Sequence, residues 1–327
     1  MSRYYKGYRI MRMLLVLMLA ALLAGCREEP KKIVGVVPKG TNHIFWQTVH
    51  AGALKAAKEN GLEVEWNAPT LEIDASRQIA IIESMVNRRL AGIALAPVDR
   101  KALVGVVERA ASLEIPVTIF DSNIDTDKRI SYIATDNREG GRMAARMLGE
   151  ILLEEGEVAI ISFMPGSAAT MEREEGFREE LAKSFPRMKV VQTAYGMADR
   201  AKARAATENI MAAHPNLRGV FADNESSSSG AILALKARGD AKVRMVAFDS
   251  NDQLVADLQD RLIDGLVVQR PFQMGYESVK ALAAKIKGQP VAPRIDLPAV
   301  LIRRGDLEKP DVIELLHPDL STWLSHK

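Results

Sequence analysis

A group of side chains that can hydrogen-bond to a ligand or stack on it follows the predicted buried strands of this chain. In the first half they are Asn42, His43, Phe45, Trp46 and Asp121, and in the second half they are Arg173, Asn224, Asp249 and Gln269. Carboxylates accept hydrogen bonds from hydroxyl groups, arginine donates hydrogen bonds from a planar fork, and amides do both. Aromatic rings offer flat faces to apolar C–H groups. This combination suits a sugar or polyol.

The tetrapeptide Phe-Asp-Ser-Asn occurs twice, each time directly after a predicted buried strand. One copy spans residues 120–123 and the other spans residues 248–251. At the carboxyl edges of two facing sheets, Asp121 and Asp249 would converge on one ligand. A single copy is commonly a turn or a helix cap. The presence of two matched copies favours a ligand site over a turn or a helix cap.

Patterns for catalysis or for metal binding are absent from the sequence. It has no Gly-x-Ser-x-Gly nucleophile turn and no Walker loop. The histidines show no metal-ligand spacing; they are His43, His50, His214, His317 and His326. Asp121 and Asp249 could be imagined as the acid and base of a glycosidase, but nothing isolates one of them in an apolar pocket. We expect no enzyme activity, no cofactor and no metal.

Strand and helix patterns alternate along the chain. Buried strands are predicted at 33–37, 92–96, 115–120, 132–135, 158–161, 219–222, 244–248 and 266–268, with further strands at 62–66 and 190–192. Helices are predicted after Asp74 and at 47–60, 101–112, 137–154, 172–185, 200–213, 229–237 and 254–260. Strands that alternate with helices of this length form βαβ units on a parallel sheet. The sequence therefore predicts two α/β sheets in tandem.

The stretch from Lys32 to Trp46 places a buried strand directly before an aromatic and polar cluster. Such a cluster at the carboxyl end of a parallel strand suits a ligand crevice. The alternative is a hydrophobic staple in which Phe45 and Trp46 hold down the next helix. The matched Phe-Asp-Ser-Asn copies favour the ligand wall.

The first 25 residues are typical of an export signal. Arg3, Lys6, Arg9 and Arg12 precede the apolar run 13–25, which is too short to span a membrane. The only cysteine, Cys26, follows Leu-Ala-Gly, which resembles the lipobox of bacterial lipoproteins. We therefore expect lipidation at Cys26 and a tether over residues 26–31. The protein would then be a membrane-anchored lipoprotein in the periplasm or at the cell surface. The alternative is an ordinary signal peptide.

Removal of the signal changes the net charge of the chain from +2 to −2, because it carries four cations and no acid. A nearly neutral protein has no global field that attracts nucleic acid. We therefore expect no nucleic-acid partner.

From Lys31 to about Ile302 the chain resembles the type I periplasmic sugar-binding proteins, and most closely the ribose-binding type. The segments that carry the resemblance are NHIFW, IPVTIFDSN, YIATDNREGGRMAA, MEREEGF, VFADNE, VAFDSN and VVQRPFQMG. The resemblance implies two Rossmann-like parallel-sheet domains joined by a three-stranded hinge. It places the N-terminal lobe at 32–135 plus 270–298, the C-terminal lobe at 136–269 plus 299–307, and an extension at 308–327.

The resemblance also implies how the site residues are used. His43 stands where ribose binders have an asparagine, and Phe45 and Trp46 take stacking positions. The polar positions with the same residue type are Asp121, Arg173, Asn224, Asp249 and Gln269. Ser122 replaces an arginine of ribose binders, and Ala198 replaces a further aromatic residue. The lost cation and ring would enlarge the pocket, so another pentose, a hexose or a polyol fits at least as well as ribose.

The resemblance implies a solute-binding component of an ABC-type sugar uptake system. The protein would be a monomer that closes on its ligand and presents a joined surface to a membrane permease. One alternative is a sugar sensor for a membrane receptor. Another is a LacI-type regulator, which is disfavoured because only a signal and a tether precede the first strand.

Two features have no assigned role at this stage. The apolar positions of the extension, which include Val312, Leu316 and Trp323, would form an amphipathic helix that packs on the body or contacts a partner. If His43 is neutral in the site, ligand affinity should fall below about pH 6 to 7.

Overall fold

The computed structural model of the protein describes residues 31–324, apart from 42 and 240–241. The predicted export signal, Cys26 and most of the tether lie outside the described residues. Within these ranges, no helix combines the length and the apolar character that crossing a membrane requires.

The first sheet has six strands in the order β11-β5-β4-β3-β1-β2. Their bounds are β1 (Lys32–Val37), β2 (Leu62–Trp66), β3 (Gly92–Leu95), β4 (Val117–Phe120), β5 (Ser131–Thr135) and β11 (Arg294–Leu297). The pairs β1–β3, β3–β4, β4–β5 and β5–β11 are parallel. Strands β3, β4 and β5 are buried along their whole length, as expected for a parallel sheet with both faces covered.

The second sheet repeats this plan, with six strands in the order β12-β10-β9-β8-β6-β7. Their bounds are β6 (Glu155–Ser162), β7 (Arg187–Tyr195), β8 (Leu217–Ala222), β9 (Arg244–Phe248), β10 (Gly265–Val268) and β12 (Val300–Ile302). Only the edge strand β12 is antiparallel to its neighbour among the pairs described. Each sheet reverses its strand order beside β1 or β6, and this is where open α/β sheets bind ligands. The prediction of two tandem α/β sheets is confirmed.

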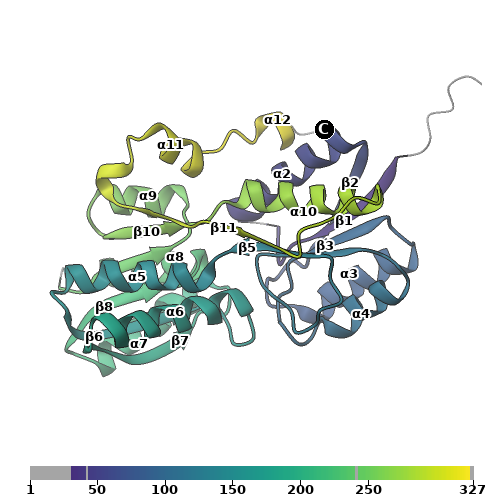
Figure 1. The fold of residues 1–327 in the computed structure, drawn as a ribbon. Helices are drawn as coiled ribbons and strands as arrows, with labels where there is room; N and C mark the ends of the chain where they lie inside the picture. The colour runs from purple at the N-terminus through teal and green to yellow at the C-terminus, as the bar shows by residue number, and fades with distance from the viewer. Residues whose placement is uncertain (1–30, 42, 240–241, 325–327) are drawn as a thin grey trace, which may run out of the picture. The chain divides into compact units, whose positions relative to one another are not determined.

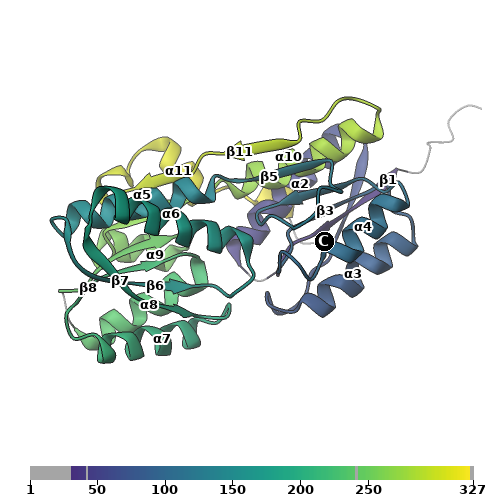
Figure 2. The ribbon, with the colours of Figure 1, turned by 60° about the horizontal axis from the view of Figure 1, so that its bottom comes forward.

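Helices cover both sheets, as Figures 1 and 2 show. Those of the first sheet are α2 (Ile44–Asn60), α3 (Ala75–Asn87), α4 (Val104–Ser112) and α10 (Pro271–Ile286). Those of the second are α5 (Asn137–Ile151), α6 (Ala168–Ser184), α7 (Arg200–Ala213), α8 (Glu225–Arg238) and α9 (Asp252–Gln259). We call each sheet with its helices the first lobe and the second lobe. Each lobe buries two apolar clusters.

The chain ends with the 3-10 turn η1 (Arg304–Asp306) and the short helices α11 (Pro310–Leu316) and α12 (Ser321–Leu324). The single amphipathic helix expected for this extension is therefore interrupted. The chain changes sheets after β5, after β10 and between β11 and β12.

Helices α2, α6, α8 and α9 begin earlier than the sequence pattern predicts, and the shifts of α2 and α8 change how residues of the candidate site are placed. Helix α2 begins at Ile44 instead of Gln47, so Phe45 and Trp46 occupy its first turn. Helix α8 begins at Glu225, because the side chain of Asn224 accepts a hydrogen bond from the Ser227 N–H and caps the helix.

Glycines allow α5 and α6 to pack with their backbones in contact. A methyl group added at Gly141 of α5 would overlap the carbonyl of Arg173, and one added at Gly176 of α6 would overlap the carbonyl of Arg138. This close approach fixes α6 against α5 and therefore sets the position of Arg173.

We expect Gly141→Ala to lower the free energy of unfolding by about 1–3 kcal/mol, because the added methyl forces the two backbones apart. The measurement is urea unfolding. Gly105→Ala is the matched control, since Gly105 is an exposed glycine of α4 with nothing near its Cβ position. The control should be neutral or up to about 1 kcal/mol more stable. A Gly141→Ala protein as stable as wild type would contradict the close packing.

Candidate functional site

The structure gathers most of the predicted site residues around one cavity between the two lobes. The first lobe contributes His43, Phe45, Trp46 and Asp121, and the second contributes Arg173, Asn224, Asp249 and Gln269. Ser122 lies behind Asp121, with its Oγ 3.3 Å from Asp121 Oδ2. Asn42 lies outside the described residues. Groups from both sheet ends therefore face one space.

The two Phe-Asp-Ser-Asn copies have the same backbone conformation at their aspartates. Asp121 has a φ of 61° and Asp249 a φ of 66°, in the left-handed region that aspartate tolerates better than most residues. Each N–H still donates to the neighbouring strand, Asp121 to the Ile133 carbonyl and Asp249 to the Val267 carbonyl. Each strand thus ends in one sharply turned aspartate that lines the cavity.

Lys39 is a cavity residue that the sequence reasoning missed. Its Nζ lies 2.8 Å from Asp121 Oδ2 and donates to Ser122 Oγ at 2.6 Å. It also approaches Ser167 Oγ of the second lobe at 3.5 Å and the Phe163 ring at 5.5 Å. A cation therefore stands beside Ser122 even though the arginine of ribose binders is absent there, so the expected loss of positive charge is corrected.

His43 bridges two carboxylates that were also missed. Its Nδ1 lies 2.6 Å from Oε2 of Glu225 in the second lobe, and its Nε2 lies 3.3 Å from Oε1 of Glu72 in the first lobe. The same Glu72 oxygen accepts from Trp46 Nε1 at 2.9 Å. Glu225 also pairs with Arg200 at 2.6 Å. The imidazole therefore connects the lobes.

The environment raises the pKa of His43 and lowers the pKa of Glu225, while burial raises the pKa of Glu72. Burial alone would lower the pKa of His43, but its hydrogen bond to Glu225 and the charge of Glu72 raise the pKa overall. Burial alone would raise the pKa of Glu225, but His43 and Arg200 lower it to about 2. The bridge is therefore strongest with a protonated imidazole.

Arg173 is buried, with an exposed fraction of 2%, and has an unused donor. Its Nε donates to Asn137 Oδ1 at 2.9 Å, its Nη1 donates to the Asp223 carbonyl at 2.8 Å, and its guanidinium lies 3.8 Å from the centre of the Phe248 ring. Its Nη2 has no hydrogen-bond partner among the residues that the structure describes. A buried donor without a partner costs ~1–3 kcal/mol, which a ligand acceptor in the cavity would recover.

Asp249 and Gln269 connect the cavity to two of the segments where the chain changes sheets. Gln269 Nε2 donates to Asp249 Oδ1 at 2.7 Å, and Gln269 Oε1 accepts from Thr135 Oγ1 at 2.7 Å. Asp249 Oδ2 accepts from the Glu225 N–H at 3.1 Å. A ligand bound to Asp249 would therefore be coupled to the inter-lobe connections.

Phe45 and Trp46 serve both roles that the sequence left open. Trp46 is buried in an apolar cluster of the first lobe, with its ring 6.5 Å from Phe120 and edge-on. The Phe45 ring lies 4.8 Å from Trp46, also edge-on. Both line the cavity, so they anchor the start of α2 and form part of the ligand wall.

The other departure from ribose binders, Ala198, lies in a second hollow. This hollow is lined by His43, Ala198, Arg200 and Ser226. Beyond His43 the site therefore has open space at the position where ribose binders carry an aromatic side chain. Among the described residues, no cluster of acidic, histidine or cysteine side chains could hold a metal ion.

A family model described as a periplasmic binding protein domain matches residues 34–290. The ribose import binding protein of Bacillus subtilis is 27% identical over 293 residues, which cover 86% of this chain and 94% of that protein. A solute-binding protein from Agrobacterium radiobacter in complex with D-arabinose is 32% identical, with a TM-score of 0.85, and the match covers 88% of this chain and 100% of that chain. One from Agrobacterium vitis bound with α-D-tagatopyranose is 29% identical, with a TM-score of 0.84 and coverage of 88% and 99%.

We expect the His43 bridge to stabilise the protein at low pH and to lose strength as the pH rises. Because the pKa of His43 is raised in the folded protein, the folded state binds the proton more tightly than the unfolded state. The contribution is complete below about pH 6.5 and is lost as the pH rises through the raised pKa. The raised pKa argues against the neutral imidazole on which the expected fall in ligand affinity was conditional, because two carboxylates face the ring.

His43→Gln should therefore destabilise the protein by on the order of 1 kcal/mol more at about pH 6 than at about pH 8.5. Urea unfolding at both pH values measures this. The difference in the free energy of unfolding between variant and wild type isolates the contribution of His43. Other groups that titrate in this range, such as Asp223, whose pKa is raised by burial to about 7, are common to both proteins. His214→Gln, which changes a histidine outside the cavity, is the control. A larger effect of His43→Gln at high pH would contradict the bridge.

Proposed function

The chain belongs to the periplasmic binding protein family, and we propose that it is the solute-binding component of an ABC-type sugar uptake system. The observation that carries the proposal is the cavity between the lobes, where matched aspartates, the free Nη2 of Arg173 and aromatic rings converge. The match to an import binding protein supports binding, not catalysis, as its activity.

We propose that the ligand is a monosaccharide in ring form or a related polyol. Solved relatives hold D-arabinose and α-D-tagatopyranose, a pentose and a ketohexose. Asp121 and Asp249 would accept hydrogen bonds from ligand hydroxyl groups, and Arg173 Nη2 would donate to a ring or hydroxyl oxygen. Asn224 and Gln269 add polar contacts, Phe45 and Trp46 cover apolar C–H groups, and Ser122 orients Asp121. Asn42 remains a predicted ligand contact.

The lobes would close by a hinge motion at the three segments where the chain crosses between them. We assign residues 32–135 and 270–298 to one moving body, and 136–269 and 299–307 to the other. In the structure the two bodies are also joined by a backbone hydrogen bond, which the Arg100 N–H donates to the Gly166 carbonyl at 3.0 Å. A bound sugar and the His43–Glu225 bridge would both stabilise this closed arrangement. A membrane permease would then recognise the closed form.

The family's name places such proteins outside the cytoplasmic membrane, and an export signal fits that location. We further propose that the mature protein is a monomer, anchored to the membrane through a lipid on Cys26.

We predict that the protein binds at least one sugar in a panel of D-arabinose, D-tagatose, D-ribose, other pentoses and hexoses, and polyols. Calorimetry and thermal shift measure binding. Arg173→Ala and Asp249→Ala should each weaken binding at least tenfold, because each removes a charged partner of the ligand, worth ~1.5–3 kcal/mol. Arg142→Ala on the exterior of α5 is the matched control and should leave affinity unchanged. No response to any carbohydrate would refute the sugar assignment.

We predict that Cys26→Ser moves the protein from the membrane fraction to the soluble fraction of the cell, because a serine cannot carry the thioether-linked lipid. Fractionation and blotting measure the distribution. Glu29→Gln in the tether keeps the cysteine and should stay membrane-bound. A Cys26→Ser protein that still sediments with membranes would rule out this anchor.

A further inference from the structure

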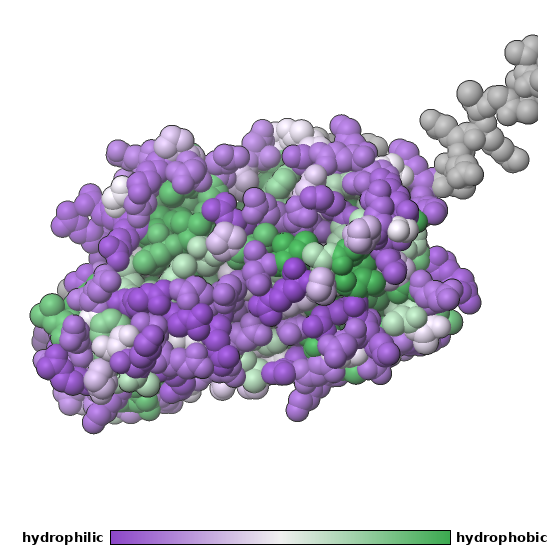
Figure 3. Space-filling view, in the orientation of Figure 1, coloured by the Kyte–Doolittle hydropathy of each residue, from purple (hydrophilic) through white to green (hydrophobic). Residues whose placement is uncertain are grey.

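The C-terminal extension touches both lobes, although the family model ends before it, at residue 290. Its first part is fixed to the second lobe. Val312 and Leu316 of α11 are buried in the same apolar cluster as Leu254, Leu258 and Ile302. Figure 3 shows one hydrophobic patch below the place of α11, and further hydrophobic patches near the middle and the right of the same face. This part moves with the second lobe.

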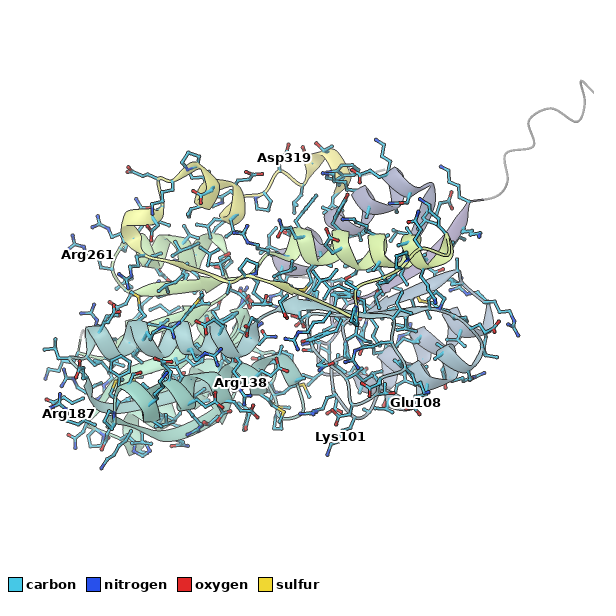
Figure 4. All side chains as sticks on the ribbon, viewed as in Figure 1. Lys101, Glu108, Arg138, Arg187, Arg261 and Asp319 are labelled. Carbon is cyan, nitrogen blue, oxygen red and sulfur yellow. The ribbon has the colours of Figure 1, made fainter. Side chains whose placement is uncertain are left out.

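The last part of the extension lies against the first lobe. Helix α12 packs beside α2, and the Lys58 Nζ of α2 lies 5.5 Å from the centre of the Trp323 ring. The segment between the two short helices runs on the outside of the molecule, where Figure 4 shows Asp319. Asp319 Oδ1 accepts from the Ser321 N–H at 3.0 Å, which forms an Asx turn directly before α12.

Between these two attachments, the extension lies behind the sugar cavity. Leu315, Leu316 and Pro318 line a small hollow together with Phe45, Asp249 and Gln269. The last three residues also line the main cavity. The extension therefore covers the rear of ligand-facing groups from both lobes.

We propose that residues 310–324 form a strap that joins the two lobes behind the cavity and favours their closed arrangement. The strap is anchored in the second lobe by buried apolar side chains and meets the first lobe through Trp323. Rotation of one lobe against the other must slide or break the contact between α12 and α2. Loss of that contact shifts the population toward the open state.

Trp323→Ala tests the strap, and Ile313→Ala is its matched control. Both remove an apolar side chain from the extension, but Ile313 on α11 is 47% exposed. In small-angle X-ray scattering without ligand, Trp323→Ala should show a larger radius of gyration than wild type, and Ile313→Ala should not. A chain that ends at Pro318 should behave like Trp323→Ala. Unchanged scattering in both strap variants would overturn the proposal.

A second readout rests on the proposed sugar function. For a sugar that binds in the panel, Trp323→Ala should raise the dissociation rate of the sugar about two- to fivefold. This is the effect expected for loss of a cation–π contact at an exposed site. An unchanged dissociation rate in Trp323→Ala would also contradict the strap. The scattering experiment needs no ligand, so failure of the sugar assignment and failure of the strap remain distinguishable.

Discussion

The charged groups at the ends of the two sheets cannot stay buried without partners, and each lobe supplies some partners for the other. Desolvation of an unpaired charge costs several kcal/mol, and this constraint organises the cleft. Lys39 satisfies Asp121 and reaches Ser167 across the gap. His43 joins Glu72 of its own lobe to Glu225 of the opposite lobe. The observed arrangement of the lobes is therefore favoured by electrostatic contacts between them.

This pairing leaves part of the hydrogen-bonding capacity of the cavity side chains unused. Asp121 and Asp249 retain acceptor capacity beside Lys39 and Gln269, while Arg173 Nη2 retains a donor. Neutral hydroxyl groups can use both without adding a net charge to the cavity. The repeated backbone turn at the two aspartates places one such acceptor at the end of each sheet, so a ligand of sugar size meets both lobes at once.

The sequence predicted the fold and most of the residues around the cavity, because repeated strand ends have a local signature. Asp121 and Asp249 were found from the repeated tetrapeptide, and the structure brings both to the cavity. Lys39, Glu72 and Glu225 were missed because a lysine or glutamate beside a strand or in a loop looks like a solvated surface residue until its distant partner is known. The pKa direction of His43 was missed for the same reason.

A crystal structure of the protein with the tightest-binding sugar tests most directly whether one sugar is held by the sheet ends of both lobes. We expect ligand hydroxyls on Asp121 and Asp249, an oxygen on Arg173 Nη2, and apolar ring faces against Phe45 or Trp46. A sugar bound to one lobe alone, or outside this cavity, would contradict this expectation.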